Sequence, residues 1–254
     1  MSGRKVLITA GAGGIGREIA RAFAAAGDQV CVLDIDDAGL AALARELPGI
    51  RTSRCDVCDL ADIERAVPTA IRLMGGLDVL VNNAGIAGPT SPVEHYDPIA
   101  WDQVMRVNLS GTFNVTRLAI PFLKQSRQAC IIVMSSVAGR YGYSNRSAYS
   151  ASKWGLIGFT KTLSRELGED GIRVNAILPG AVAGERIENV LAGRASVSGR
   201  SVDDERETAM AAQSLRRFVD PKDIAALALF LASDAGKSIS GQMLPIDNDM
   251  QYAG

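Results

Sequence analysis

The chain alternates between short runs of apolar residues and longer segments with apolar residues at helical spacing. Apolar runs of about 4–8 residues between turn signals are typical of buried strands, whereas apolar positions three and four residues apart indicate helices. The predicted strands are Val6–Thr9, Gln29–Asp34, Arg51–Cys55, Leu77–Val81, Ala129–Ser135, Ile172–Leu178 and Gln242–Ile246. The predicted helices are Ile15–Ala26, Ala38–Leu47, Leu60–Leu73, Ile99–Gln125, Ser147–Leu167 and Pro221–Ala232.

A repeated strand–helix order of this kind predicts a doubly wound parallel sheet, an α/β fold with helices on both faces. The strands read as continuous apolar runs, as expected where both faces of a sheet are covered. No linker, repeat or low-complexity segment interrupts the chain. We therefore expect residues 1–254 to form a single domain.

One segment, residues 180–214, departs from this alternation and is predicted to be irregular. It has Gly184, Gly193 and Gly199 as helix breakers and carries four arginines among small residues: Arg186, Arg194, Arg200 and Arg206. A long insertion of this composition in a compact domain is often a mobile lid over a ligand. The alternative is a surface excursion with solvated charges. Its place in the chain favours a substrate lid.

Composition narrows the function. The chain has 254 residues, 47% of them hydrophobic and 22% charged, with a formal net charge of −1. It has no basic tract, so nothing in the charge pattern indicates binding to nucleic acid or a membrane surface. The apolar run Val6-Leu7-Ile8 is too short for a signal sequence or a membrane span. We expect a cytoplasmic protein whose partner is a small molecule.

The cysteines give no metal or disulfide pattern. Cys31 and Cys130 sit inside apolar runs, where a free cysteine is usually a small buried hydrophobe. Cys55 and Cys58 form a C-x-x-C, which is half of a zinc site or a redox pair in other contexts. No second pair and no histidine cluster completes such a site, because His95 is the single histidine. We predict that no metal is bound.

A glycine-rich turn follows the first strand: Thr9-Ala10-Gly11-Ala12-Gly13-Gly14-Ile15-Gly16. Small residues let a pyrophosphate approach the backbone, and the following helix directs its free N–H groups and positive dipole end toward it. Asp34 ends the next strand, 18 residues beyond Gly16, close to the ~20 expected for a carboxylate that binds the adenine ribose. This context predicts a Rossmann-like, dinucleotide-binding domain.

Asp34 also indicates NAD rather than NADP. Its carboxylate would repel a 2′-phosphate, and neither Ile35 nor Gly13 supplies a cation. The alternative is that Asp34 is the N-cap of the second helix.

Tyr149 and Lys153 are four residues apart on a predicted helix, so the phenol and the ammonium share one face. A free tyrosine has a pKa of ~10 and is a poor base at neutral pH. A nearby cation favours the phenolate and lowers that pKa, which would let Tyr149 exchange a proton with an alcohol or a carbonyl. The pair follows a strand that ends at Ser135-Ser136, at the sheet edge where ligands bind.

These motifs together resemble the short-chain dehydrogenase/reductase family over nearly the whole chain. The residues that carry the resemblance are the Thr9–Gly16 turn, Asp56-Val57, Asn82-Asn83-Ala84-Gly85, Asn108, Ser135-Ser136, Tyr149-x-x-x-Lys153 and Asn175-x-x-x-Pro179-Gly180. The resemblance implies hydride transfer between a nicotinamide cofactor and an alcohol/carbonyl pair. It also implies a homotetramer built on the long helices.

The resemblance assigns roles to particular positions. It implies that Ser136 binds the substrate oxygen, that Tyr149 is the acid/base, that Lys153 lowers the pKa of Tyr149 and holds the nicotinamide ribose, and that Asn108 anchors a water linked to Lys153. The implied cofactor-binding residues are Gly11, Gly13, Ile15, Asp34, Asp56, Val57, Asn83, Ala84, Gly85, Tyr149, Lys153, Pro179, Gly180 and Val182.

Three positions depart from the family pattern. Ala10 replaces the usual first glycine, which is tolerable where φ is negative. Gly184 stands where a threonine often fixes the carboxamide of the cofactor. Asp247-Asn248-Asp249 replaces a common Asp-Gly-Gly, at a subunit interface or beside the substrate pocket.

We therefore expect an NAD-dependent dehydrogenase or carbonyl reductase. A non-catalytic NAD sensor is disfavoured because all four catalytic positions are kept. Aromatic residues make up only 5% of the chain. Polar residues cluster in the sequence near the reaction centre, namely Arg140, Tyr141, Tyr143, Asn145 and Arg146, and the lid segment adds its four arginines. Arginine suits anionic groups, so a sugar, polyol or hydroxy acid is the expected substrate. The alternative is a 3-oxoacyl thioester; surface solvation would explain the arginines equally well.

Overall fold

A computed structural model describes residues 3–252. Within that range seven strands form one parallel sheet in the order β3-β2-β1-β4-β5-β6-β7. The strands are β1 (Lys5–Thr9), β2 (Gln29–Asp34), β3 (Arg51–Arg54), β4 (Val79–Asn82), β5 (Cys130–Met134), β6 (Arg173–Pro179) and β7 (Met243–Ile246). The order reverses between β1 and β4, so the predicted doubly wound sheet is confirmed.

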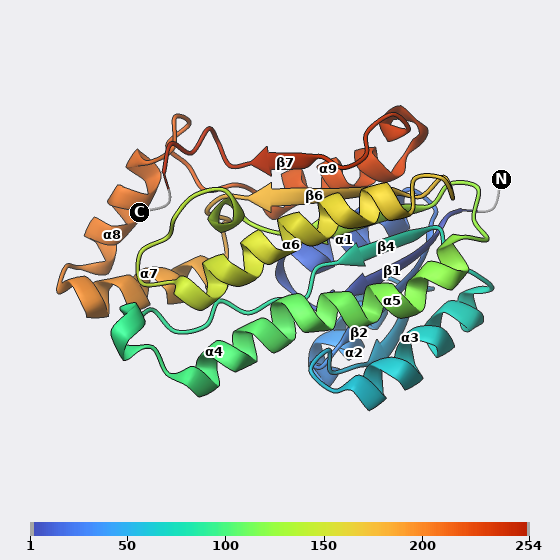
Figure 1. Cartoon of the computed structure of the whole chain (residues 1–254), viewed down its shortest axis with the longest axis horizontal. Helices are drawn as coiled ribbons and strands as arrows, with labels where there is room; N and C mark the ends of the chain where they lie inside the picture. The colour runs from blue at the N-terminus through green and yellow to red at the C-terminus, as the bar shows by residue number, and fades with distance from the viewer. Residues whose placement is uncertain (1–2, 253–254) are drawn as a thin grey trace.

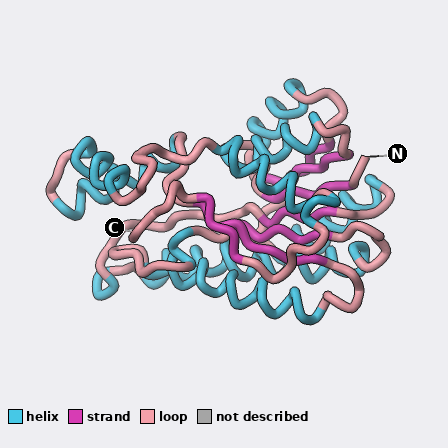
Figure 2. Tube along the Cα trace, turned by 90° about the horizontal axis from the view of Figure 1, so that it is seen from above, coloured by secondary structure: helices cyan, strands magenta, loops and turns pink. Residues whose placement is uncertain are grey.

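Helices cover both faces of the sheet (Figures 1 and 2). Helices α3, α5 and α6 pack on one face, and α1, α2 and α9 pack on the other. The helices are α1 (Gly14–Ala25), α2 (Asp37–Glu46), α3 (Leu60–Met74), α4 (Pro98–Met105), α5 (Thr112–Leu123), α6 (Ser147–Glu166), α7 (Glu185–Ser198), α8 (Val202–Ala211) and α9 (Pro221–Ala232). Short 3-10 turns lie at η1 (Val93–His95), η3 (Val137–Gly139) and η4 (Asp234–Gly236).

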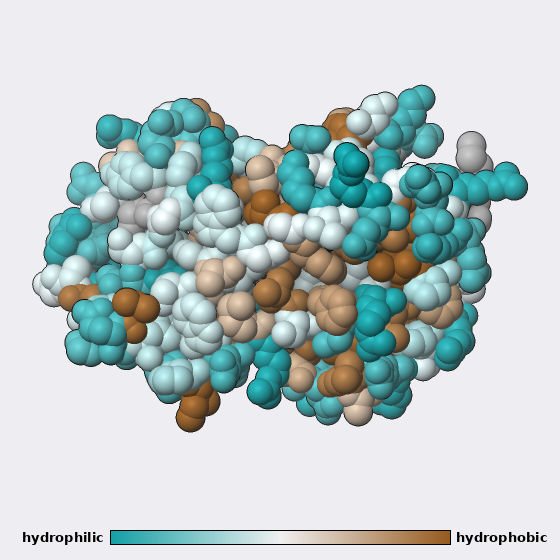
Figure 3. Space-filling model, viewed as in Figure 1, coloured by the Kyte–Doolittle hydropathy of each residue, from teal (hydrophilic) through white to brown (hydrophobic). Residues whose placement is uncertain are grey.

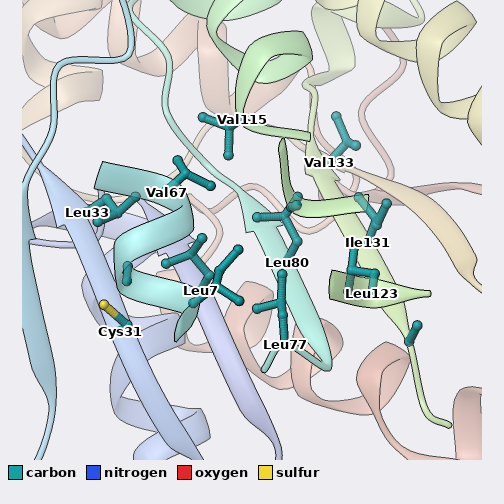
Figure 4. Close-up of a cluster of buried hydrophobic side chains, with 14 of the residues drawn as sticks. Leu7, Cys31, Leu33, Val67, Leu77, Leu80, Val115, Leu123, Ile131 and Val133 are labelled. Atoms are coloured by element: carbon teal, nitrogen blue, oxygen red, sulfur yellow. The ribbon is translucent and has the colours of Figure 1, made fainter. Parts of the chain in front are cut away.

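The apolar runs are continuous because alternate residues enter two different hydrophobic layers. Leu7 of β1 and Leu80 of β4 point toward α3 and α5, where they meet Val67 and Val115 (Figure 4). Their strand neighbour Ile8 points to the opposite layer, against α1 and α9. Burial of each such side chain contributes roughly 1.5–3 kcal/mol relative to exposure. The edge strand β3 is an exception to the predicted pattern, because its polar residues are half-buried or exposed.

The long helical pattern predicted over Ile99–Gln125 is not one continuous α-helix. A π-helical turn, η2 (Arg106–Gly111), separates α4 from α5 and contains Asn108. π-helical turns inside helices are often found at functional sites. The apolar spacing continues through the turn, so the sequence pattern did not reveal it.

The segment 180–214 was predicted to be irregular, and this prediction is wrong. It forms helices α7 and α8, which project from one end of the molecule (Figure 1). They bury a small apolar cluster of Ile187, Leu191 and Ala209. Ser201 and Asp204 form a capping box at the start of α8. The narrow apolar stripe explains why helical periodicity was not evident.

The visible surface is mostly hydrophilic, with apolar side chains gathered over α5 and α6 (Figure 3). Phe113 and Trp154 are half-exposed large hydrophobic residues on these two helices. Among residues 3–252, no helix is both long and apolar enough to span a membrane. Over the same range, no three His, Cys, Asp or Glu side chains form a group able to hold a metal ion, and the thiols of Cys55 and Cys58 are free.

Candidate active site

A cavity of about 610 Å³ opens at the carboxyl ends of the strands, where a doubly wound sheet binds its ligands. It collects most of the site residues expected from the sequence. Those that line it are Gly13, Ile15, Asn83, Gly85, Ser136, Tyr149, Lys153, Pro179, Gly180 and Val182. The others, which lie outside the cavity lining, are Gly11, Asp34, Asp56, Val57, Ala84 and Asn108.

The glycine-rich turn leaves the start of α1 open to this cavity. Gly13 is the N-cap of α1 and offers no side-chain cap, so the first N–H groups of the helix are free for a ligand. A Cβ at Gly13 would meet nothing within 4 Å. A Cβ at Gly16 would lie 2.3 Å from the Ala10 carbonyl oxygen, so only glycine fits there. This uncapped helix end fits the pyrophosphate of a dinucleotide.

Ala10 departs from the expected backbone conformation. Its φ is +51°, in the left-handed region, whereas the substitution for glycine was expected to be tolerated through a negative φ. The conformation costs an alanine roughly 1–2 kcal/mol. Hydrogen bonds hold it in place: the Ala10 N–H donates to the Leu33 carbonyl at 2.7 Å, and Asn83 Nδ2 donates to the Ala10 carbonyl at 2.8 Å.

Asn83 and Ala84 are tied to the glycine-rich turn. The backbone N–H groups of both residues donate to Thr9 Oγ1, at 3.0 and 3.1 Å. Because β1 and β4 are neighbours in the sheet, these bonds join the loops that follow the two strands, at the point where the strand order reverses. Asn83 therefore fixes the shape of the cofactor cleft as well as lining it.

Asp34 lies at the end of β2, beneath the same turn. Its carboxylate accepts hydrogen bonds from the Ala12 N–H at 2.9 Å and the Asp36 N–H at 3.1 Å. The N-cap of α2 is Asp36, so the alternative role of Asp34 as N-cap is wrong.

Asp56 and Val57 follow β3. Asp56 accepts the Cys58 N–H at 2.8 Å, which forms a local turn. If Gly111 of η2 carried a Cβ, that atom would lie only 2.8 Å from the Val57 carbonyl oxygen. The loop after β3 therefore packs closely on η2.

Tyr149, Lys153 and Ser136 meet at the cavity, as the motifs predicted. Burial raises the pKa of the Tyr149 phenol. The positive charges of Lys153, Arg186 and Arg146 and a hydrogen bond from Ser136 outweigh burial, so the pKa falls below its usual value of 10. Burial lowers the pKa of Lys153 to about 8, against the attraction of Tyr149. The pair is suited to proton transfer near neutral pH.

Lys153 is held from two sides. Its Nζ donates to the Met134 carbonyl at 2.8 Å, and its own carbonyl accepts from Ser135 Oγ at 2.9 Å. These bonds fix the start of α6 against the end of β5. A Cβ at Gly85 would lie 3.3 Å from both Lys153 Nζ and Asn108 Oδ1, so the three residues meet at one point.

Asn108 is fully buried within η2. Its side chain donates to the Ile86 carbonyl at 3.0 Å and to Ser152 Oγ at 2.9 Å, and accepts from the Ile86 N–H at 2.8 Å. Asn108 therefore positions the loop after β4 and the helix that carries Tyr149.

Gly184 has a conformational reason to differ from the family threonine. Its φ is +132°, a region that L side chains rarely adopt, and it precedes the first turn of α7. Val182 forms a bridge with Val219, which anchors the segment leading into α7. Because glycine has no side chain, it cannot make the contact that the family resemblance assigns to a threonine here.

The Asp247-Asn248-Asp249 segment leads the chain to the cavity. Asn248 and Asp249 have φ values of +56° and +57°, which explains why the family favours glycine there and why Asn and Asp are tolerated. The Asn248 side chain donates to the Arg217 carbonyl at 2.7 Å. Met250 and Tyr252 beyond it line the cavity, so this tail lies beside the pocket.

Only part of the predicted polar cluster reaches the cavity. Tyr143 and Arg146 line it, and so do Arg186 and Arg194 from α7. Two of the lid arginines instead pair with acidic residues: Arg200 lies 3.5 Å from Glu205, and Arg206 bonds Glu188. Tyr141 is not part of the lining and donates to the Met250 carbonyl at 3.0 Å, and Arg140 and Asn145 also lie outside the lining.

Some residues of the lining were missed in the sequence. Arg17, Met134 and Ala212 are examples, along with Met250 and Tyr252. Arg17 lies one residue beyond Gly16, a position that marked it as a neighbour of the glycine-rich turn. The tail residues carried no motif, because only the fold brings them next to α7 and α8.

Known proteins match this chain along nearly its whole length. A family model described as enoyl-(acyl carrier protein) reductase matches residues 10–250. The chain is 37% identical over 254 residues to 3-oxoacyl-(acyl-carrier-protein) reductase FabG of Thermotoga maritima, with 98% of each chain covered. It is 36% identical over 252 residues to D-beta-hydroxybutyrate dehydrogenase of Cupriavidus necator, with 97% of each covered.

The fold comparison agrees. The solved structure of NAD+-bound xylitol dehydrogenase superposes with a TM-score of 0.92 at 28% identity, covering 96% of this chain and 98% of that one. The catalytic motifs, the parallel sheet and these likenesses lead to one assignment. The chain belongs to the short-chain dehydrogenase/reductase family and is an oxidoreductase that interconverts alcohols and carbonyls.

Proposed function

We propose that this oxidoreductase uses NAD(H) and acts on a small polar substrate: a sugar, a polyol or a hydroxy acid. The observation that carries the substrate class is the cavity wall beside Tyr149, which is formed by Tyr143, Arg146, Arg186 and Arg194. Such groups donate hydrogen bonds to hydroxyl and carboxylate oxygens. Screening sugars, polyols and hydroxy acids with NAD, and following absorbance of the reduced cofactor, tests this proposal.

The charges around Asp34 support NAD over NADP. Asp36 and Asp37 follow after Ile35, so the edge of the cofactor cleft is rich in carboxylates. Arg54 is opposite Asp34 in the β2–β3 register, but it lies 3.7 Å from Asp37 and 3.8 Å from Asp62. The charge of Arg54 is thus offset by its acidic neighbours, and a ribose 2′-phosphate would be repelled.

Replacing Asp34 with Ala is expected to relax this cofactor preference. The wild type should favour NAD over NADP by at least tenfold in kcat/KM, and the variant should lose most of that ratio while it still turns over substrate. Because Asp34 also holds the Ala12 N–H, Asp34→Asn is the matched variant that removes charge but keeps an acceptor. A wild-type preference for NADP of tenfold or more would refute the assignment.

The chain's own residues supply the proton chemistry. The glycine-rich turn and Lys153 would hold a nicotinamide cofactor, which would supply the hydride chemistry at the substrate carbon. Ser136 binds the substrate oxygen, and Tyr149 takes its proton during oxidation or returns one during reduction. Lys153 keeps the phenolate accessible through its charge.

A 3-oxoacyl thioester is the second candidate substrate, favoured by the similarity to the Thermotoga maritima reductase. A purely cofactor-sensing role is disfavoured, because Asn108, Ser136, Tyr149 and Lys153 are all present and meet at the cavity edge.

We also propose a homo-oligomer, supported by the apolar side chains exposed over α5 and α6 (Figure 3).

We propose that residues 180–214 act as a substrate lid. Helices α7 and α8 contribute Arg186, Arg194 and Ala209 to the cavity wall, and their own apolar cluster is small. Amide hydrogen exchange in this segment should slow when cofactor and substrate analogue bind, because elements with few buried contacts open most readily. Equally strong protection with and without ligands would rule out a lid.

A further inference from the structure

Arg146 is a buried cation without a buried counter-charge. Only 3% of the Arg146 surface is exposed. Two of its nitrogens donate to neutral groups, Thr90 Oγ1 at 3.2 Å and the Ala87 carbonyl at 3.1 Å, and its Nε has no partner. Among residues 3–252, no carboxylate oxygen lies within 4.0 Å of it. Burying an unpaired charge is unfavourable, because the protein interior solvates it less well than water does.

Two more arginines approach the same place from α7. The guanidinium carbons of Arg146 and Arg194 lie 5.6 and 5.1 Å from the centre of the Tyr143 ring. Arg186 lies 5.9 Å from the centre of the Tyr149 ring and donates to the Gly85 carbonyl at 3.2 Å. Neither α7 arginine has an acidic partner within 4.0 Å in the described part of the chain.

Like charges gathered this way repel one another unless an anion joins them. Burial lowers the pKa of Arg146, and the charges of Arg186 and Arg194 lower it further. The acidic residues of the cavity lining do not neutralise the group: Glu18 pairs with Arg21, and Glu185 is exposed at the start of α7. The Tyr149 phenolate also faces Arg146, but it carries no charge whenever the phenol is protonated, so a permanent negative charge is expected to come from a ligand.

We propose that Arg146, with Arg194 and Arg186 from α7, binds the carboxylate of the substrate, so that the enzyme acts on a short hydroxy acid or the matching oxo acid. This inference rests on the proposed function and selects one of its substrate classes. Arg146 uses two of its five N–H groups for Thr90 and Ala87, and the rest can form a fork that matches a planar carboxylate.

The position of Arg146 sets the length of that acid. Its guanidinium carbon lies 5.3 Å from the centre of the Tyr149 ring, whose hydroxyl meets the reacting oxygen. The carboxylate and the carbinol carbon must then be only a few bonds apart, as in 2-hydroxy and 3-hydroxy acids. Bound substrate would also draw the arginines of α7 onto Arg146, which couples recognition to closure of the lid.

Matched acids and amides test the inference. The wild type with NAD should oxidise a short 3-hydroxy acid with a kcat/KM at least about 100-fold above that of the corresponding 3-hydroxy amide, because the amide leaves the guanidinium unpaired. Arg146→Gln should lower kcat/KM for the acid roughly 100-fold and change that for the amide less than about threefold. The 2-hydroxy acid and its amide serve as a second pair.

Two further variants allow the inference to be tested even if the Arg146→Gln protein does not fold. Arg194→Gln changes a half-buried helix residue and should lower kcat/KM for the acid about tenfold while sparing the amide. Arg117→Gln is the control, because Arg117 pairs with Glu64 at 3.1 Å, outside both the cavity lining and the lid segment. It should leave both substrates within about twofold of the wild type. If Arg146→Gln does not fold, Arg194→Gln and the wild-type acid-to-amide ratio decide.

Other results of these assays would contradict either the carboxylate assignment alone or the proposed function as a whole. Equal turnover of acid and amide, or better turnover of a neutral polyol, a sugar or an uncharged 3-hydroxyacyl N-acetylcysteamine thioester, overturns the carboxylate assignment. It leaves the NAD-dependent oxidoreductase in place. Preference for a phosphate monoester over the acid also overturns it. Absence of NAD-dependent turnover for every substrate class overturns the proposed function as well.

Discussion

Tyr149→Phe is expected to lower kcat by about 10²–10⁴-fold while the protein stays folded and binds NAD. An alkoxide formed at the substrate carbon needs a proton as it develops, and an oriented acid accelerates that step by this factor. The substitution removes one hydroxyl and keeps the ring, so the packing beside Arg146 and Lys153 persists. Steady-state kinetics with the best substrate, together with NADH fluorescence titration, measure both properties.

The pH profile gives a second readout of the same residue. Oxidation requires the phenolate, so kcat should rise with pH through one ionisation below 10, since the cations around Tyr149 lower its pKa. Reduction requires the phenol and should fall over the same range. Tyr96→Phe is the matched control, because its hydroxyl is buried without a partner and lies outside the cavity lining. Near-normal kcat in folded, NAD-binding Tyr149→Phe would refute the mechanism.

Lys153→Ala is expected to be at least as harmful as Tyr149→Phe, with kcat lower by about 10²-fold or more. Lys153 is the largest favourable charge on the Tyr149 phenolate. Its loss should move the ionisation in the oxidation profile to higher pH, which a purely structural defect would not do. It should also raise the KM for NAD, because the family resemblance places Lys153 at the nicotinamide ribose.

The control for Lys153→Ala lies on the same helix. Lys161 donates to the Gly241 carbonyl, away from the cavity. Lys161→Ala should leave kcat and the pH profile unchanged. Because the charge of Lys153 is costly to bury, its removal is not expected to unfold the protein. An unshifted pH profile in Lys153→Ala would show that Lys153 does not set the pKa of Tyr149.

The sheet and the catalytic centre were predictable because each rests on local patterns. Apolar runs such as Val6–Thr9 must be buried, and their alternation with helices fixes parallel strands and a common edge for the motifs. Tyr149 and Lys153 come together through one helix turn, so their meeting needs no knowledge of the rest of the fold. Ser136 joins them because β5 ends beside that helix.

The features that escaped prediction depend on distant contacts. The left-handed conformation of Ala10 is set by Leu33 on β2 and by Asn83 directly after β4. Helices α7 and α8 bury few apolar residues, although Ser201 and Asp204 had the spacing of a capping box and could have revealed α8. The division of the arginines into those that face the cavity and those paired with Glu188 or Glu205 follows from the helix arrangement alone.

The tail beyond β7 has a practical consequence for protein production. Its backbone bonds to the loop after α8: the Gln251 N–H donates to the Ala212 carbonyl at 2.9 Å, and Met250 pairs with Gln213. The carboxyl end thus lies at the helices that carry Arg186 and Arg194, whereas the amino end lies at the opposite side of the molecule (Figure 1). An affinity tag or immobilisation linker is therefore best attached at the amino end, since a tag at the carboxyl end would lie beside the helices that line the cavity.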